Sequence, residues 1–237
     1  MSAAERATVT FDLFSALLDS RSGASAALEE IACDRGWPVT GEHLYDAWDP
    51  RNKAAQRDCV TWVPWREPAT RALADAYAEL GLAGDPTADV EALAASMARW
   101  PLWPDVVAGL PRLAEHCRVG LLSNVDDELF ARTAAAPLVD PDAALTSQRL
   151  RAYKPHPEIY RRARDQLGGL VHVATSARDV RGALEAGIPV VRLRRPGHGL
   201  DPDGPRPTQE VERVDDLARL LAAGVLTRRG GRPGPGR

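Results

Sequence analysis

The chain has 237 residues, enough for one domain with an insertion and for a hydrophobic core that needs no covalent reinforcement. Its 30 basic and 33 acidic residues give a net charge of −3, which favours neither nucleic acid nor an anionic membrane as a partner. Three widely spaced cysteines argue against a disulfide framework, and the sequence shows neither a secretion signal nor a long apolar run. We therefore expect a cytoplasmic protein that acts on a small molecule.

The first predicted element is a short buried strand at Thr8–Phe11, because its residues are β-branched or aromatic. Asp12 follows this strand directly. Ligands of open parallel sheets bind at the carboxyl ends of the strands, so this carboxylate is a candidate nucleophile. From the residue alone, a turn or helix-capping role for Asp12 is equally acceptable.

Residues 20–100 show helical periodicity and no convincing strand. Ser20–Gly23 is predicted to be a turn, and Pro50 is predicted to separate two helices. The predicted helices of this insert are Ser25–Arg35, Glu42–Trp48, Arg51–Asp58, Pro68–Leu80 and Ala88–Arg99. All six tryptophans lie within 37–103, where they build the core of the insert, line an apolar roof over Asp12, or do both.

After a linker at Pro101–Pro104, helices and strands alternate, which is typical of a parallel, doubly wound α/β sheet with right-handed crossovers. The predicted strands are Arg118–Leu122, Ala143–Thr146, Val171–Ala174 and Pro189–Leu193. The predicted helices are Asp105–His116, Asp127–Ala136, Glu158–Leu167, Asp179–Ala186 and Val214–Ala223. We expect a core domain from 1–19 and 101–227, an all-helical domain from 20–100 and a disordered tail at 228–237.

Four motifs, each at the end of a predicted strand or the start of a helix, are the basis of a family resemblance. They are FDLFSALLD at 11–19, LLSN at 121–124, AYKPHPEIY at 152–160 and HVATSARDVRGALEAG at 172–187. In this order they make the chain resemble the haloacid dehalogenase-like (HAD) hydrolase superfamily over residues 7–195, and most closely its 2-haloacid dehalogenase branch. The resemblance implies a Rossmann-like core and identifies the helical insert with the mobile cap of that family.

The resemblance also implies a covalent mechanism in which Asp12 attacks an electrophilic carbon or phosphorus and water then hydrolyses the enzyme ester. Lys154 would orient Asp12, and Asp179 would accept a hydrogen bond from Lys154 or from the hydrolytic water. Alternatively, Lys154 is a solvated surface lysine and Asp179 caps a helix. Only Lys53 and Lys154 among the 30 basic residues are lysines, which makes a mere surface role for Lys154 less expected.

The same resemblance implies which residues bind the substrate. Ser123 and Asn124 would meet its anionic end, although both could instead cap the helix that follows. Tyr160 is a further candidate, or else a core aromatic. The five histidines show no metal-ligand spacing, so we expect no zinc site.

Two departures from the superfamily pattern argue against a phosphatase. Its phosphatases carry a second acid two residues after the nucleophile, to protonate the leaving group, and this position is Phe14. They hold Mg²⁺ with an acid five residues before the last motif's Asp, and this position is Ala174. Halide leaves without a proton, and the dehalogenase branch has an aromatic residue at the position of Phe14. We therefore expect no cofactor, with Mg²⁺ required only if the protein is a phosphatase.

Other departures weaken the match to the dehalogenase branch. The Gly-Thr that follows the aromatic residue in the family is Ser15-Ala16, and Ala174 and Ser176 replace a Ser and an Asn of the last motif. The halide-binding arginine of the cap matches best to Arg51 in WDPRNK, which is displaced by two residues. Arg51 could equally be a helix-surface arginine.

Three hypotheses follow. The leading one is a metal-independent hydrolase that removes a good leaving group, such as halide, from a small organic acid through an Asp12 ester. The second is a phosphatase of the same superfamily, and the third is a catalytically silent HAD-fold binding protein. In each case the expected partner is a small anionic molecule, and a homodimer is one possible assembly.

Overall fold

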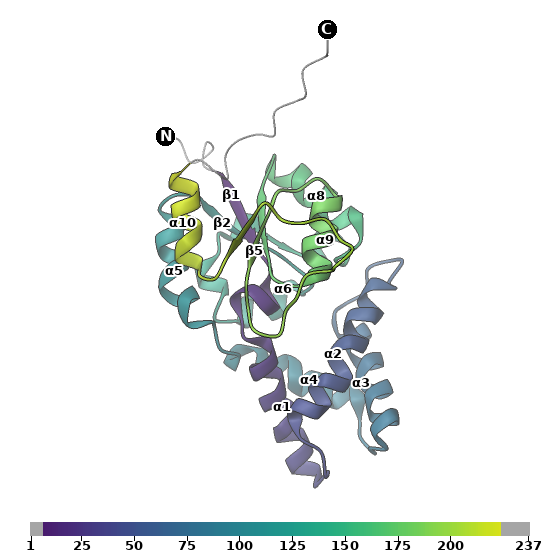
Figure 1. The fold of residues 1–237 in the computed structure, drawn as a ribbon. Coiled ribbons are helices and arrows are strands. Elements are labelled where there is room, and N and C mark those ends of the chain that lie inside the picture. The colour runs from purple at the N-terminus through teal and green to yellow at the C-terminus, as the bar shows by residue number, and fades with distance from the viewer. Residues whose placement is uncertain (1–6, 224–237) are drawn as a thin grey trace.

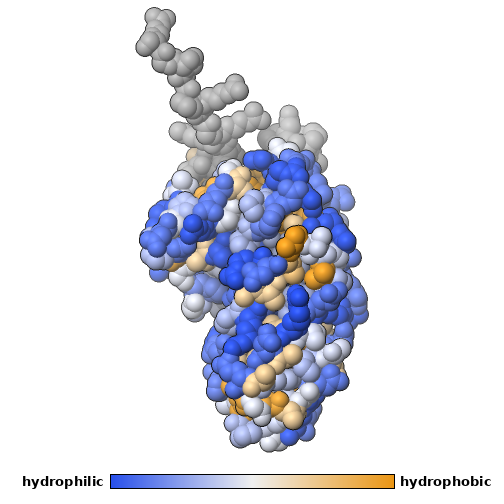
Figure 2. All heavy atoms as spheres, turned by 90° about the vertical axis from the view of Figure 1, so that its right-hand side faces the viewer, coloured by the Kyte–Doolittle hydropathy of each residue, from blue (hydrophilic) through white to orange (hydrophobic). Residues whose placement is uncertain are grey.

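A computed structural model describes residues 7–223, which form a sheet-containing part and a group of helices that projects from it (Figure 1). The predicted tail at 228–237 lies outside the described residues. None of the described helices is both long enough and apolar enough to cross a membrane. The face in Figure 2 is mostly hydrophilic, with small and separate hydrophobic spots.

All pairs in the six-stranded sheet are parallel, in the order β3-β2-β1-β4-β5-β6. The strands are β1 Thr8–Phe11, β2 Arg118–Ser123, β3 Ala144–Thr146, β4 Val171–Ala174, β5 Val190–Leu193 and β6 Gln209–Val211. Strand order reverses at β1, which pairs with β2 on one side and with β4 on the other. Such a switch point is where open α/β sheets bind ligands. The predicted doubly wound α/β fold is confirmed, and β1 delivers Asp12 to this point.

Successive side chains of a strand point to opposite faces of the sheet, and here both faces carry apolar side chains. Helices therefore cover both faces. One face packs against α5 Pro104–Ala114 and α10 Val214–Ala222, and the other against α8 Pro157–Leu167 and α9 Ala177–Glu185 (Figure 1). Leu121 of β2 belongs to the first core and Leu122 to the second. The remaining core helices are the short α6 Asp127–Arg132 and α7 Ser147–Leu150.

The insert consists of four α-helices and, within residues 20–100, no strand. They are α1 Ser20–Arg35, α2 Gly41–Arg57, α3 Arg66–Leu80 and α4 Pro86–Ser96, followed by a 3₁₀ turn at Met97–Arg99. The chain enters it through a π-helical turn at Leu13–Leu17, and Leu18 and Leu102 form an isolated antiparallel bridge where it returns.

The sequence analysis was wrong about the start of α1 and the course of α2. Ser20–Gly23 is helical, because the Asp19 side chain accepts from Ser22 N and caps the helix at that point. Helix α2 runs through Pro50 without a break. A proline removes one helical hydrogen bond, and the buried residues of α2 on both sides of it, among them Trp48 and Asn52, hold the helix together.

The edge strand β6 was missed as well. It has three residues, of which only Val211 is buried, so it lacks the apolar run by which the other strands were predicted.

The contact between α1 and α2 leads to a prediction about stability. A Cβ atom built on Gly41 would lie 2.0 Å from Ser25 O and 2.5 Å from Glu29 N, and both are backbone atoms. We expect Gly41→Ala to lower the free energy of unfolding by about 1–3 kcal/mol in urea denaturation. The control is Gly199→Ala, where no atom lies within 4 Å of the new Cβ. Equal stability of the two variants would contradict the close approach of the helices.

Candidate active site

Asp12 lies immediately after β1, with its backbone N–H donating to Val173 O of β4 at 3.1 Å. Its Oδ2 accepts from the backbone N (3.2 Å) and the hydroxyl (2.7 Å) of Ser15, in the turn that follows. Its Oδ1 accepts from Ser123 Oγ at 3.0 Å and from Lys154 Nζ at 2.8 Å. The side chain is therefore held in one orientation at the switch point of the sheet.

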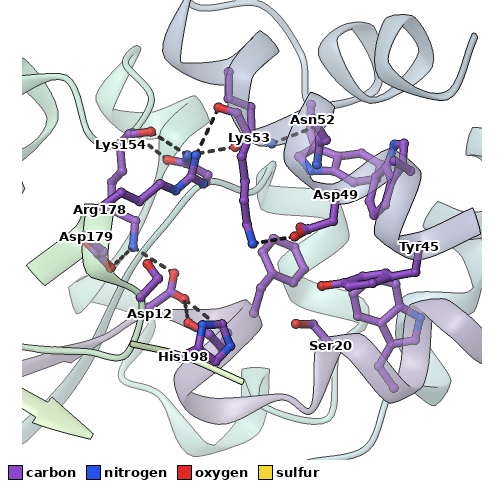
Figure 3. A pocket seen from close by; sticks show the side chains of 18 residues that line it. Asp12, Ser20, Tyr45, Asp49, Asn52, Lys53, Lys154, Arg178, Asp179 and His198 are labelled. Carbon is purple, nitrogen blue, oxygen red and sulfur yellow. Dashed lines mark hydrogen bonds and ion pairs between the residues drawn. The ribbon is translucent and has the colours of Figure 1, made fainter. Parts of the chain in front are cut away.

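Lys154 places its ammonium group between two buried carboxylates. Its Nζ donates to Asp12 Oδ1 (2.8 Å), to Asp179 Oδ2 (2.6 Å) and to Leu122 O (2.8 Å), which uses all three of its N–H groups. The Lys154 side chain is only 4% exposed. Figure 3 shows the lysine reaching both carboxylates. It is a buried ion-pair partner and not a solvated lysine.

Both carboxylates are ionised at neutral pH. Burial raises the pKa of Asp12, but the charge of Lys154 and hydrogen bonds from Lys154 and Ser15 outweigh it, so the pKa lies below its ordinary value. Burial likewise raises the pKa of Asp179, and the charge of Lys154 together with the contact to His172 outweighs it. A carboxylate needs no deprotonation before it attacks, so Asp12 is ready to act as a nucleophile.

Asp179 lies in the first turn of α9, which starts two residues earlier than predicted. Besides Lys154, it accepts from Tyr160 Oη at 2.8 Å and contacts His172 Nε2 at 3.1 Å. Tyr160 is fully buried in the second core, where its hydroxyl also lies 3.4 Å from Asp179 O, and it does not line the cavity. Burial, followed by the charge of Asp179, raises the pKa of Tyr160, so its hydroxyl remains a donor.

His172 was not recognised as a site residue from the sequence. It is fully buried in β4, opposite Thr10 of β1, and its Nδ1 lies 3.0 Å from Thr10 Oγ1. A carboxylate can only accept, so Nε2 of the ring donates to Asp179. The sequence did offer one signal, because Thr10 and His172 are polar residues inside strands that were predicted to be buried. Their pairing, however, depends on the register of β1 and β4.

Ser123 and Asn124, at the end of β2, are already engaged by the protein. Ser123 Oγ donates to Asp12 and accepts from Leu13 N at 3.3 Å. Asn124 Nδ2 donates to Gln56 Oε1 (2.9 Å) and to Lys154 O (3.0 Å), and its Oδ1 accepts from Lys154 N (2.7 Å). Both residues thus hold Asp12, Lys154 and the insert in place, and neither has a free side-chain N–H or O–H for a ligand.

A cavity with a volume of about 80 Å³ opens beside Asp12. Helix α2 supplies much of its wall, with Tyr45, Trp48, Asp49, Asn52, Lys53 and Gln56. Trp65, Trp100 and Phe14 add apolar surface, and Ser176, Arg178 and Asp179 enter from the start of α9. Three of the six tryptophans therefore line this cavity while lying in the hydrophobic core.

The cations of the cavity differ from those expected. Arg51 does not line it, because its guanidinium donates to Ala47 O and pairs with Glu79 on the insert. Lys53, two residues further along α2, projects into it instead, beside Asp49 (Figure 3). Arg178 also lines it, and neither Lys53 nor Arg178 belonged to the predicted site.

The residues beside Asp12 do not fit a magnesium ion. The Lys154 ammonium occupies the position between the Asp12 and Asp179 carboxylates, and a second cation there would be repelled. Ala174 offers no side-chain ligand, whereas Mg²⁺ is bound through oxygen atoms. Within residues 7–223, no three His, Cys, Asp or Glu side chains are grouped to hold a metal ion.

The fold and this arrangement define a Rossmann-like hydrolase, and comparisons with known proteins give its family. The model of the haloacid dehalogenase-like hydrolases matches residues 7–187, so the chain belongs to this family, as the four motifs predicted. An (S)-2-haloacid dehalogenase from Xanthobacter autotrophicus is 31% identical over 205 residues, which cover 79% of this chain and 74% of that protein.

Two further comparisons extend over most of the chain. The (S)-2-haloacid dehalogenase 4A from Burkholderia cepacia is 27% identical and covers 91% of this chain and 94% of its own. The solved structure of an L-2-haloacid dehalogenase from Xanthobacter autotrophicus superposes with a TM-score of 0.76 at 23% identity. It covers 91% of this chain and 98% of that one, which shows that the fold is shared.

The charge cluster leads to a prediction about pH and stability. Since the pKa values of Asp12 and Asp179 are lowered by folding, their contribution to stability is present above the ordinary carboxyl pKa near 4 and is lost as the pH falls below it. We expect Asp179→Asn to lower the free energy of unfolding by about 3–5 kcal/mol at pH 7, because it removes one partner of a buried pair. This difference from wild type should shrink below pH 4.

Urea denaturation at several pH values measures this effect. The matched control is Asp165→Asn, which removes an exposed partner of Arg161 and should cost no more than about 1 kcal/mol. A difference for Asp179→Asn that stayed constant between pH 7 and pH 3 would show that Asp179 is not held as a carboxylate by folding.

Proposed function

We propose that this hydrolase displaces halide from the α-carbon of a small 2-haloacid through an ester to Asp12. The observation that carries the proposal is the ionised Asp12 carboxylate, held by Lys154 in a small cavity and accompanied by Phe14 and Ala174 in place of an acid and a metal ligand. The names of the relatives from Xanthobacter and Burkholderia support it.

In the first step, a carboxylate oxygen of Asp12 forms a bond to the carbon that carries the halogen. The carbon–halogen bond breaks, and halide leaves with the electron pair and without a proton. Water then attacks the carboxyl carbon of the Asp12 ester, which releases a 2-hydroxy acid, a proton and the Asp12 carboxylate. The ammonium of Lys154 keeps Asp12 aligned and remains paired with Asp179 when Asp12 is esterified and neutral.

The size of the cavity supports a small substrate. A cavity needs roughly 10–15 Å³ on the same measure to hold one water molecule, so about 80 Å³ accommodates on the order of six. A 2-halopropionate has a comparable number of non-hydrogen atoms. The aromatic wall of Phe14, Trp65 and Trp100 would shield the reaction from bulk water.

The division of labour within the site follows from its hydrogen bonds. We propose that Asp179 acts as a positioning residue, since its oxygens are bound by Lys154, Tyr160 and His172. Ser176, which lines the cavity, would contact the substrate or the hydrolytic water. The family's phosphatase chemistry remains the second candidate, and its specific difficulty is that the Lys154 ammonium lies between the Asp12 and Asp179 carboxylates and would repel a metal ion there. A catalytically silent binding protein is the third candidate, because Ala174 and Ser176 replace two residues of the last motif that would help to position water.

We further propose that the helical insert, residues 20–100, is a cap that closes over the core formed by 1–19 and 101–227. Polar contacts join the two parts at the cavity. Asn124 donates to Gln56, Arg178 Nη1 donates to Lys53 O at 3.1 Å, and the Asp126 carboxylate accepts from Trp65 N. It remains a prediction that the protein needs no metal or other cofactor and that it is cytoplasmic. A homodimer remains one possible assembly.

The nucleophile is tested by Asp12→Asn with 2-chloropropionate or 2-bromopropionate as substrate. The amide is a poor nucleophile, so we expect halide release to fall at least about a hundredfold, while the surface variant Asp165→Asn retains the wild-type rate. Wild-type activity should be the same in Mg²⁺ and in EDTA. Magnesium-dependent phosphate release from an aryl phosphate, lost in Asp12→Asn, would show the phosphatase instead.

Closure of the cap is tested by amide hydrogen exchange with and without propionate, a non-reactive analogue. We expect propionate to slow amide exchange in residues 40–70, the segment that supplies much of the cavity wall. Exchange in the strands of the sheet should not change, because their amides are already protected. Identical exchange in both samples, at a propionate concentration that saturates binding, would describe a static insert.

A further inference from the structure

The side chains expected to bind the anionic end of the substrate have no hydrogen-bond donors left. Ser123 donates to Asp12, and the Asn124 amide donates to Gln56 and to Lys154 O. Lys154 spends its three N–H groups on Asp12, Asp179 and Leu122 O. A substrate carboxylate that enters the cavity must therefore find another partner, or it loses its hydration without compensation.

Arg178 is such a partner. It lies in the first turn of α9, half-buried, and its guanidinium borders the same cavity as Asp12. Only one of its N–H groups is used within the described part of the chain, in the bond from Nη1 to Lys53 O. That bond orients the guanidinium from the cap side, and Figure 3 shows the group in the cavity wall between Lys154 and the backbone of Lys53. The remaining N–H groups can meet two carboxylate oxygens in parallel.

Lys53 is less suited to this task. Its ammonium is paired with the carboxylate of Asp49, which also borders the cavity and repels anions. Arg178 has no acidic partner of its own among residues 7–223, because the neighbouring Asp179 is bound by Lys154, His172 and Tyr160. A planar guanidinium also matches a carboxylate better than an ammonium does.

The charge of the cavity wall points the same way. Its carboxylates are Asp12, Asp49 and Asp179, and its permanent cations are Lys53, Lys154 and Arg178. These charges cancel, so removing Arg178 would leave a net charge of −1 in a small enclosed space and disfavour any anionic ligand. Ser176, the N-cap of α9, makes no capping hydrogen bond with its side chain and borders the cavity next to Arg178.

We infer that Arg178 recognises the carboxylate of the substrate. The inference deepens the proposed function, on which it rests for the reaction but not for the binding of a carboxylate. Arg178 would thus bind the substrate, whereas Asp12 would perform the chemistry. Its bond to Lys53 O gives it a second task, because the same guanidinium joins core and cap.

The test combines binding and kinetics on Arg178→Met, Arg178→Lys and a matched control, Arg181→Met. Arg181 is an exposed arginine of the same helix, paired with Glu185 and Asp201. Binding of propionate is measured by calorimetry, and turnover of 2-chloropropionate by chloride release. Near-ultraviolet circular dichroism reports whether each variant is folded.

We expect Arg178→Met to weaken propionate binding at least about tenfold and to raise the KM for 2-chloropropionate by a similar factor, with a smaller effect on kcat. Arg178→Lys should recover part of the affinity, since it retains the charge, and Arg181→Met should match wild type. A wild-type protein that releases no halide but binds propionate through Arg178 would overturn the proposed reaction and leave this inference standing.

Three results would overturn the inference. The first is a folded Arg178→Met variant that binds propionate as tightly as wild type does. The second is a loss in kcat with unchanged KM and unchanged propionate affinity, which would identify Arg178 as a tether between core and cap. The third is a wild-type protein that does not bind propionate at all.

Discussion

The structure of the site depends on one buried ammonium group placed between two buried carboxylates. Removing any of these charges from water is costly, and the cost is recovered only when geometry and hydrogen bonding are nearly complete. The Nζ atom of Lys154 meets this condition with three acceptors at 2.6–2.8 Å. The cluster of Lys154, Asp12 and Asp179 nevertheless keeps a net charge of −1, which would be neutralised if Asp12 formed an ester as proposed. The same arrangement therefore holds the site together and leaves one carboxylate reactive.

The sheet provides this geometry through its strand order. Asp12 follows β1, Ser123 ends β2, and Asp179 lies in the helix after β4. These three strands are neighbours in the sheet although they are far apart in the chain. Below them, the pair Thr10 and His172 connects β1 to β4 and donates to Asp179 from within the core. A shift in register between these two strands would separate this pair and would move the carboxylates relative to Lys154. The positions of the charged groups in the site thus depend on the order and register of the strands.

The sequence sufficed to predict those features that are local in the chain. The strand Thr8–Phe11, the alternation of helices and strands, and Asp12 at a strand end followed from residue patterns, and the family followed from four motifs. Sequence patterns could not show that the Asn124 amide donates to Gln56 and to Lys154 O, because these bonds depend on how the insert lies over the core. For the same reason Arg178 was overlooked. An arginine next to a motif residue has no distinguishing signal until the cavity around it is known.

Helix α2 shows why the insert was harder to predict than the core. Pro50 ordinarily ends a helix, but here the residues after it are the ones that the site requires, with Asn52, Lys53 and Gln56 all facing the cavity. The contacts of these residues with the core couple the two parts of the molecule. Each bond between cap and core, such as Asn124 to Gln56 or Arg178 to Lys53 O, is worth about 1 kcal/mol, so a few of them hold the cap without locking it.

If the insert is a cap, as we propose, its opening would break bonds that belong to the site itself. Asn124 would lose Gln56 while it still holds the backbone of Lys154, and Arg178 would lose the carbonyl that orients its guanidinium. In the open state the carboxylate anchor would be free to move and the nucleophile would be exposed to water. In the closed state both are oriented and enclosed by aromatic side chains. In this proposal the same contacts close the cap and complete the site, so substrate binding and exclusion of water would be linked by geometry and would require no separate signal.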